Sequence, residues 1–193
     1  LKPKYKTLEL FGSRVPYLMK NNFQVWRFLT PVFLHANFVH IVFNIISQLI
    51  FGSIIEKQIG TKKIVFSYFF CAIGGNLFGA IVNKSAAVGA STSITGLVGV
   101  FLAFIIVNWK RLDSNNKNFL LGVTGFMIIF NILCGFADSF QQKGNSLDGI
   151  DNYGHLGGLI IGISTGMFLV QPLGETLNAY EKRIQKLGKC LSI

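Results

Sequence analysis

Ser91 and His155 are residues of the types that nucleophilic acyl transfer needs, although they lie far apart in the sequence. Ser91 follows Gly89 and Ala90, and small residues at this point let a substrate backbone come close to the hydroxyl. A serine hydroxyl becomes a strong nucleophile when a neighbouring base takes its proton, and neutral histidine is the commonest such base. Alternatively, Ser91 packs against a neighbouring helix, and His155 is a structural histidine bonded to a backbone carbonyl.

Both residues lie in long apolar stretches. Val88–Val107 is twenty residues without a charge, the length that an α-helix needs to cross a bilayer core of about 30 Å. The chain is 51% hydrophobic and only 13% charged, which is typical of a polytopic membrane protein without a separate soluble domain. The predicted spans are Phe38–Ile55, Ile64–Val82, Val88–Val107, Phe119–Phe136 and Tyr153–Val170.

The charges between these spans predict their orientation. One set of connections carries ten basic residues, namely Lys57, Lys62, Lys63, Lys110, Arg111, Lys117, Lys182, Arg183, Lys186 and Lys189. The opposite set carries only Lys84 and Lys143, so we expect the first set to lie in the cytoplasm. This asymmetry explains the net charge of +10 without a nucleic-acid partner. The basic segment before Trp26 then falls on the outer side, which predicts a missing upstream span.

This topology brings Ser91 and His155 to one depth. The third and fifth spans run in the same direction, and both residues lie roughly 3–5 Å below the outer ends of their helices. Glycine recurs at every fourth position of the fifth span, and small residues recur likewise in the third. These two faces, Gly154–Gly158–Gly162–Gly166 and Ser91–Thr95–Gly99–Ala103, are suited to close helix packing. The shared depth favours a catalytic pair over two packing residues.

His40 and Asn44 are candidates for stabilising an oxyanion. Their spacing of four places them on one face of the first span, and their N–H groups could point at the same oxygen as the Ser91 amide. Alternatively, Asn44 hydrogen-bonds between helices. Metal binding by His35, His40 and His155 is a rival interpretation, but neither a carboxylate nor a cysteine is well placed to complete the site. Asp151 either orients the imidazole or is a solvated loop acid.

These residues stand in motifs that resemble those of the rhomboid intramembrane serine proteases. The motifs are HANFVHIVFN from His35, GASTSITGLVG from Gly89, GHLGG from Gly154, the pair Trp26-Arg27, Glu56 with Gly60, and Gly74-Gly75-Asn76. They run in order from about Trp26 to Val170. The resemblance implies a six-helix core whose first helix is absent from this chain. It also implies a Ser91–His155 dyad without an acid, and a fourth span that moves to admit a substrate helix.

The resemblance implies two further roles near the site, and the chain departs from the family at two positions. His40 and Asn44 would belong to the oxyanion hole, and Trp26-Arg27 to a partly inserted loop beside it. The family usually has glycine after the serine and an aromatic residue four positions after it, where this chain has Thr92 and Thr95. Thr92 would narrow the oxyanion site and Thr95 would loosen the histidine.

The sequence and the resemblance therefore predict an all-α polytopic membrane protein that cleaves peptide bonds in or near the transmembrane helices of membrane-protein substrates. We expect an amino-terminal segment with the inserted loop (1–37), a transmembrane catalytic core (38–171) and a cytosolic amphipathic tail (172–193). The active site faces the non-cytosolic side and uses neither metal nor cofactor. An inactive rhomboid-like protein that binds membrane clients is the alternative. A metal or small-solute transporter fits the number of spans but leaves the Ser91–His155 pair unexplained.

Overall fold

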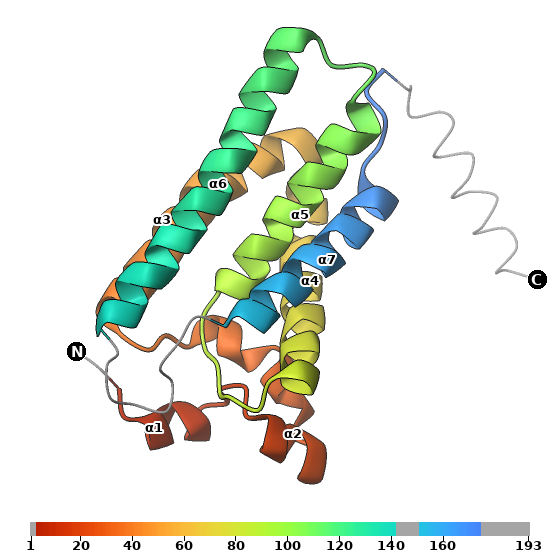
Figure 1. Ribbon diagram of the computed structural model, residues 1–193. Coiled ribbons are helices and arrows are strands. Elements are labelled where there is room, and N and C mark those ends of the chain that lie inside the picture. Colours follow the sequence, from red (N-terminus) through yellow and green to blue (C-terminus); the bar gives the residue numbers. More distant parts are fainter. Residues whose placement is uncertain (1–2, 142–150, 175–193) are drawn as a thin grey trace, which may run out of the picture.

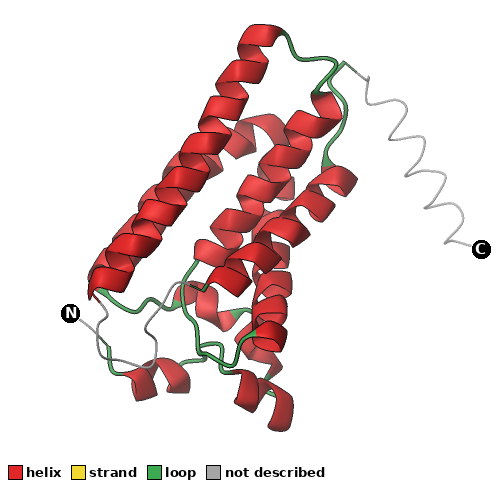
Figure 2. Cartoon of the chain, viewed as in Figure 1, coloured by secondary structure: helices red, strands yellow, loops and turns green. Residues whose placement is uncertain are grey.

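The computed structural model describes residues 3–141 and 151–174. Figure 1 shows a bundle of long helices, with shorter helices packed at one end, and Figure 2 shows that the described residues form helices and loops. The one β-type pairing within these residues is an isolated bridge between Arg14 and Ala87. The predicted all-α fold is therefore confirmed.

Each of the five predicted spans is a helix. They are α3 (Phe38–Ile59), α4 (Thr61–Val82), α5 (Ser91–Asn108), α6 (Ser114–Gln141) and α7 (Asn152–Leu169). Within the described residues, α3, α4 and α5 are long and apolar enough to cross a membrane. The helix boundaries differ from the predicted ones, most of all in α6, which begins five residues earlier and ends five residues later than predicted. Helix α3 continues to Ile59, where Gly60 with φ of 86° ends it, and α5 begins at Ser91, just after Gly89 with φ of 126°.

The amino-terminal segment has more regular structure than the sequence pattern indicated. It contains two short α-helices, α1 (Tyr5–Leu10) and α2 (Pro16–Asn21), and two 3₁₀ turns, η1 (Val25–Phe28) and η2 (Thr30–Phe33). Pro16 and Pro31 stand near the starts of α2 and η2, where the missing proline N–H leaves no bond unmade. These elements lie at the end of the bundle where α5 and α7 begin (Figure 1).

Helix α5 is the centre of the bundle. Thirteen of its residues are buried, so it is enclosed by other helices rather than by lipid. It packs most extensively against α7, then against α4, and it also contacts α3 and α6 (Figure 1). Because α5 is held on all sides, its first residue, Ser91, has a well-defined position.

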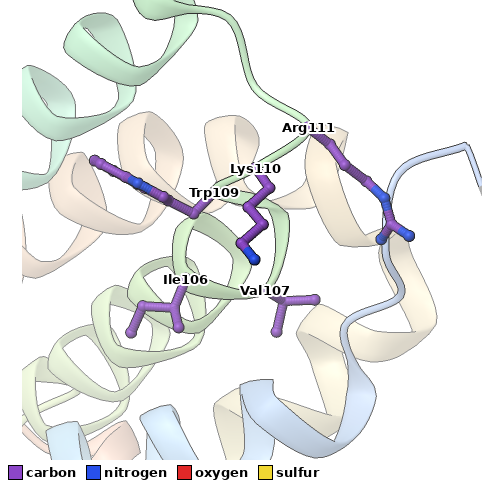
Figure 3. A pocket seen from close by; sticks show the side chains of 5 residues that line it. All are labelled: Ile106, Val107, Trp109, Lys110 and Arg111. Atoms are coloured by element: carbon purple, nitrogen blue, oxygen red, sulfur yellow. The ribbon is translucent and has the colours of Figure 1, made fainter.

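The end of α5 opposite to Ser91 carries basic and aromatic side chains. Figure 3 shows a pocket there that is lined by Ile106, Val107, Trp109, Lys110 and Arg111. Lys117 lies over the Trp109 ring, with its Nζ 5.0 Å from the ring centroid. At 1.5 Å per residue this pocket begins about 22 Å from Ser91 along the helix, so it is separate from the serine. The predicted amphipathic tail from residue 175 onward, and Lys143, lie outside the described residues.

Candidate active site

The structure brings Ser91 and His155 into direct contact. Ser91 is the first residue of α5 and His155 is the fourth residue of α7. The His155 Nε2 lies 2.7 Å from the Ser91 Oγ, which is hydrogen-bond distance. In the tautomer that carries its proton on Nδ1, Nε2 accepts this bond from the serine hydroxyl. The geometry is that of a nucleophile beside its general base.

Glycines bring α5 and α7 close enough for this contact. A Cβ at Gly162 would lie 2.7 Å from the carbonyl carbon of Gly96, and one at Gly158 would collide with the carbonyl oxygen of Thr92. A Cβ at Gly166 would lie 2.5 Å from the Cβ of Ala103. The backbones of the two helices therefore touch, as the small-residue pattern predicted.

The predicted contact faces need two corrections. The side of α5 that α7 covers includes Ser91, Gly96, Gly99 and Ala103, whereas the prediction had Thr95 in the place of Gly96. The atoms nearest to a Cβ at Gly154 would be those of Asp151 and Arg14, so this glycine makes room for these two side chains. The cause is the rotational phase of the helices, because one residue is about 100° of turn.

The side chain of Thr92 faces α4. Thr92 is 3% exposed, and its Cγ2 occupies the space that a Cβ on Gly75 would need. Its methyl group therefore packs between α5 and α4. The Thr95 hydroxyl donates to the carbonyl oxygen of Ser91 at 2.8 Å, so it is engaged with its own helix.

His40 borders the serine, whereas the Asn44 amide is turned along its own helix. A Cβ at Gly89 would lie 2.8 Å from His40 Nε2 and 3.5 Å from Ser91 Oγ, so the ring and the hydroxyl face the same place. The Asn44 Nδ2 donates to the His40 carbonyl at 2.8 Å, and Asn44 is 5% exposed. This bond uses one of the two Nδ2 hydrogens, so the other is left to donate to an oxyanion.

The remaining histidine, His35, packs edge to face on His40, with their ring centroids 5.2 Å apart. Within residues 3–141 and 151–174, no group of three His, Cys, Asp or Glu side chains is arranged to hold a metal ion.

The segment before Ser91 is fastened to the 3₁₀ turns. Arg27 in η1 is 4% exposed and donates to the carbonyls of Glu9 and Ser13 at 2.8 and 2.7 Å. Burial lowers the pKa of Arg27, and the nearby Glu9 opposes this shift. The Gly89 amide donates to the Pro31 carbonyl in η2 at 2.9 Å. Turn η2 thus holds the chain two residues before the serine, and Arg27 of η1 holds the segment that includes Glu9 and Ser13.

Asp151 and Arg14 form an ion pair that sequence reasoning did not find. Asp151 caps α7 and binds the buried Arg14, so it is neither a solvated loop acid nor placed by its bonds against the imidazole. The two residues are 137 positions apart, and Arg14 lies in a segment without clear periodicity. Only the cap position of Asp151, just before an apolar helix, is readable from the sequence.

Comparison with known proteins gives a consistent match. The family model of the rhomboid domain matches residues 22–172. Rhomboid-like protease 1 of Toxoplasma gondii is 39% identical over 90% of this chain, and Rhomboid-like protease 3 of the same organism is 33% identical over 97%. The chain spans 56% and 63% of those two proteins. Inactive RHOMBOID-like protein 8 of Arabidopsis thaliana is 30% identical over 83% of this chain, which spans 42% of it.

Proposed function

We propose that this chain, which belongs to the rhomboid family, is an intramembrane serine endopeptidase with Ser91 as nucleophile and His155 as general base. The observation that carries the proposal is the 2.7 Å contact between the Ser91 hydroxyl and the His155 ring nitrogen. Family membership, which the motifs predicted, makes transmembrane proteins the expected substrate class. The protein is an integral membrane protein.

The reaction follows from the geometry of the pair. His155 Nε2 takes the Ser91 proton as Oγ attacks the scissile carbonyl carbon, and a tetrahedral oxyanion forms. The imidazolium then gives this proton to the leaving amine, so the peptide C–N bond breaks and an acyl-enzyme remains. Water attacks the ester with His155 again as base, which releases the carboxylic acid and regenerates Ser91.

The oxyanion needs hydrogen-bond donors near Ser91. The Ser91 amide is at the amino terminus of α5, where helix N–H groups have no partner within the helix, and no side chain caps it. His40 borders the same space through Gly89. Asn44 is the third donor that we propose, through the Nδ2 hydrogen that does not bond the His40 carbonyl.

We assign substrate access to the side of α6. Among the residues that the structure describes, this helix packs less extensively on its neighbours than α4, α5 and α7 do on one another. Its contact with α3 depends on aromatic rings. Phe130 lies 5.7 Å from Phe51 and 6.4 Å from Phe43, measured between ring centroids. Displacing a few rings is a smaller change than separating backbones in contact, so the α3–α6 side is the one that can open toward lipid.

Fluorophosphonate labelling together with cleavage of a reconstituted transmembrane substrate tests the proposal. We expect the wild type to label at Ser91 and to cleave, and Ser91→Ala and His155→Ala to do neither. The double variant should be no worse than either single variant, because nucleophile and base act as a unit. Ser164→Ala is the matched control, since this exposed serine on α7 bonds only the carbonyl of Ile160 at 3.0 Å.

Two results would contradict the proposal. Cleavage by purified Ser91→Ala would rule out Ser91 as the nucleophile. A folded wild type that neither labels nor cleaves would favour the alternative, a rhomboid-like protein that binds membrane clients without cutting them. The relative named inactive makes this alternative worth testing. The packing of Thr92 against Gly75 argues against Thr92 as its cause.

A further inference from the structure

Arg14 lies between the two chain segments that lead into Ser91 and His155. Its side chain is fully buried, with 0% exposed. Its backbone N–H donates to the Ala87 carbonyl at 2.9 Å, and its carbonyl accepts from the Ala87 N–H at 3.0 Å. Ala87 is four residues before Ser91, so the main chain of Arg14 is fixed to the loop that delivers the serine.

The side chain of Arg14 reaches the other segment. Its Nη1 and Nη2 donate to the two carboxylate oxygens of Asp151 at 2.6 and 2.7 Å, which is a bidentate ion pair. Asp151 is four residues before His155 and caps α7. Its Oδ1 accepts from the Gly154 amide at 3.1 Å, and its carbonyl accepts from the His155 amide at 2.9 Å. Arg14 is therefore linked to the backbone of His155 through one intervening residue, Asp151.

Two glycines on different helices leave the space for this guanidinium. A Cβ at Gly79 of α4 would lie 2.8 Å from the Arg14 Cζ and would overlap its Nη1. A Cβ at Gly154 of α7 would lie 2.9 Å from the same Nη1. Any residue larger than glycine at either position would displace the guanidinium, so both glycines are needed to accommodate the ion pair.

We propose that Arg14 and Asp151 are positioning residues, whose ion pair holds the start of α7 so that His155 stays within hydrogen-bond distance of Ser91. This inference rests on the proposed function. A buried ion pair adds little net stability compared with an apolar pair of similar volume. A bidentate pair does fix direction as well as distance. Arg14 is joined to the segment before Ser91 by its backbone and to the segment before His155 by its side chain. The conformation of Arg14 therefore determines how the starts of α5 and α7 lie relative to each other.

Arg14→Gln tests the pair, because it removes the charge and the fork but keeps a polar side chain. We expect the rate of fluorophosphonate inactivation at saturation, kinact, to fall about 10- to 100-fold, because small displacements of catalytic groups have effects of this size. We expect the same fall in kcat for a transmembrane substrate. The inhibitor KI and the substrate KM should not change. Asp151→Asn should show the same loss, although asparagine still caps the helix.

Lys20→Gln is the matched control, because it removes one positive charge from an exposed position of the same segment and should keep wild-type kinetics. If Arg14→Gln does not fold, the double variant Arg14→Gln, Asp151→Asn carries the test, since it leaves no buried charge unpaired. A folded variant with lowered thermal stability and wild-type kinact would overturn the inference and leave the pair a structural role.

The failure of this inference is distinguishable from failure of the proposed function. Wild type that labels at Ser91, with variants that label equally fast, refutes only the positioning role. Wild type that does not label refutes the proposed function, and ¹⁵N NMR of the His155 imidazole then still tests the pair. We expect the Nε2 resonance to move away from its hydrogen-bonded position in Arg14→Gln. An unchanged resonance would overturn the inference.

Discussion

Gly162→Ala tests whether the spacing of α5 and α7 sets catalysis. The new Cβ would lie 2.7 Å from the carbonyl carbon of Gly96 and 3.0 Å from its Cα. Non-bonded carbons prefer about 3.5–4.0 Å, so the helices must separate by roughly 1 Å at this point. The carbonyl oxygen of Gly96 would overlap the new Cβ as well. All three colliding atoms belong to the backbone, and a change of rotamer therefore cannot relieve the overlap.

The separation should reach the Ser91–His155 contact. His155 is seven residues from position 162, about 10 Å along a rigid helix, so much of the displacement is carried to it. A 2.7 Å contact that lengthens by even part of this amount is no longer a good hydrogen bond. We expect kcat/KM to fall about 100-fold. Overpacking should cost about 1–3 kcal/mol of stability, offset by up to about 1 kcal/mol from the better helix propensity of alanine.

Gly122→Ala is the control for this prediction. A Cβ at Gly122 of α6 would meet no atom within 4 Å, so the same chemical change should keep full activity and gain a little stability. The assay is cleavage of a reconstituted substrate by protein shown to be folded, with thermal unfolding measured beside it. Equal activity of the two variants would refute the reasoning, because it would mean that the contact at Gly162 does not determine the position of His155.

Three other predictions follow from the site and the topology. Asn44→Ala should lower kcat by roughly two to three orders of magnitude with little change in KM, as for loss of one oxyanion donor; unchanged kcat would leave Asn44 a packing role. Phe130→Ala should lower thermal stability yet raise kcat/KM for a transmembrane substrate without changing fluorophosphonate labelling, whereas slower cleavage would argue against access beside α6. In a cysteine-free background, Lys84→Cys should react with an impermeant maleimide from outside and Lys110→Cys only after permeabilisation; the reverse would invert the predicted orientation.

Periodic features of the sequence predicted most of the fold. Long apolar stretches gave the five helices, and the repeated glycines of Gly158, Gly162 and Gly166 gave the close packing of α7 on α5. The alternation of spans gave α5 and α7 the same direction, and together with the small-residue faces this predicted the contact of Ser91 with His155. The depth of the pair in the membrane stays a prediction. Such patterns are readable because a helix repeats the same contact every three or four residues.

Features without a repeat could not be read in this way. The direction of the Thr92 side chain depends on the rotation of α5 about its axis, and an error of one residue turns it by about 100°. The Asn44 amide bonds the His40 carbonyl, and the sequence does not predict this partner because the choice depends on which acceptors lie nearby in the folded chain. The ion pair of Arg14 with Asp151 joins two loops across 137 residues, and each residue by itself resembles an ordinary loop charge.

The glycine contacts between α5 and α7 and the Arg14–Asp151 ion pair restrict different displacements of α7. Lipid is as apolar as the helix surfaces, so helices in a membrane associate through close packing and hydrogen bonds rather than through the hydrophobic effect. The glycine contacts of α7 with α5 fix how near the helices lie, but a smooth glycine surface resists sliding and rotation weakly. A directional contact at the helix start resists both. Asp151 makes one with the buried Arg14, whose backbone is bonded to the loop before Ser91. Variants of Gly162 and of Arg14 should therefore impair the same reaction through different displacements of His155.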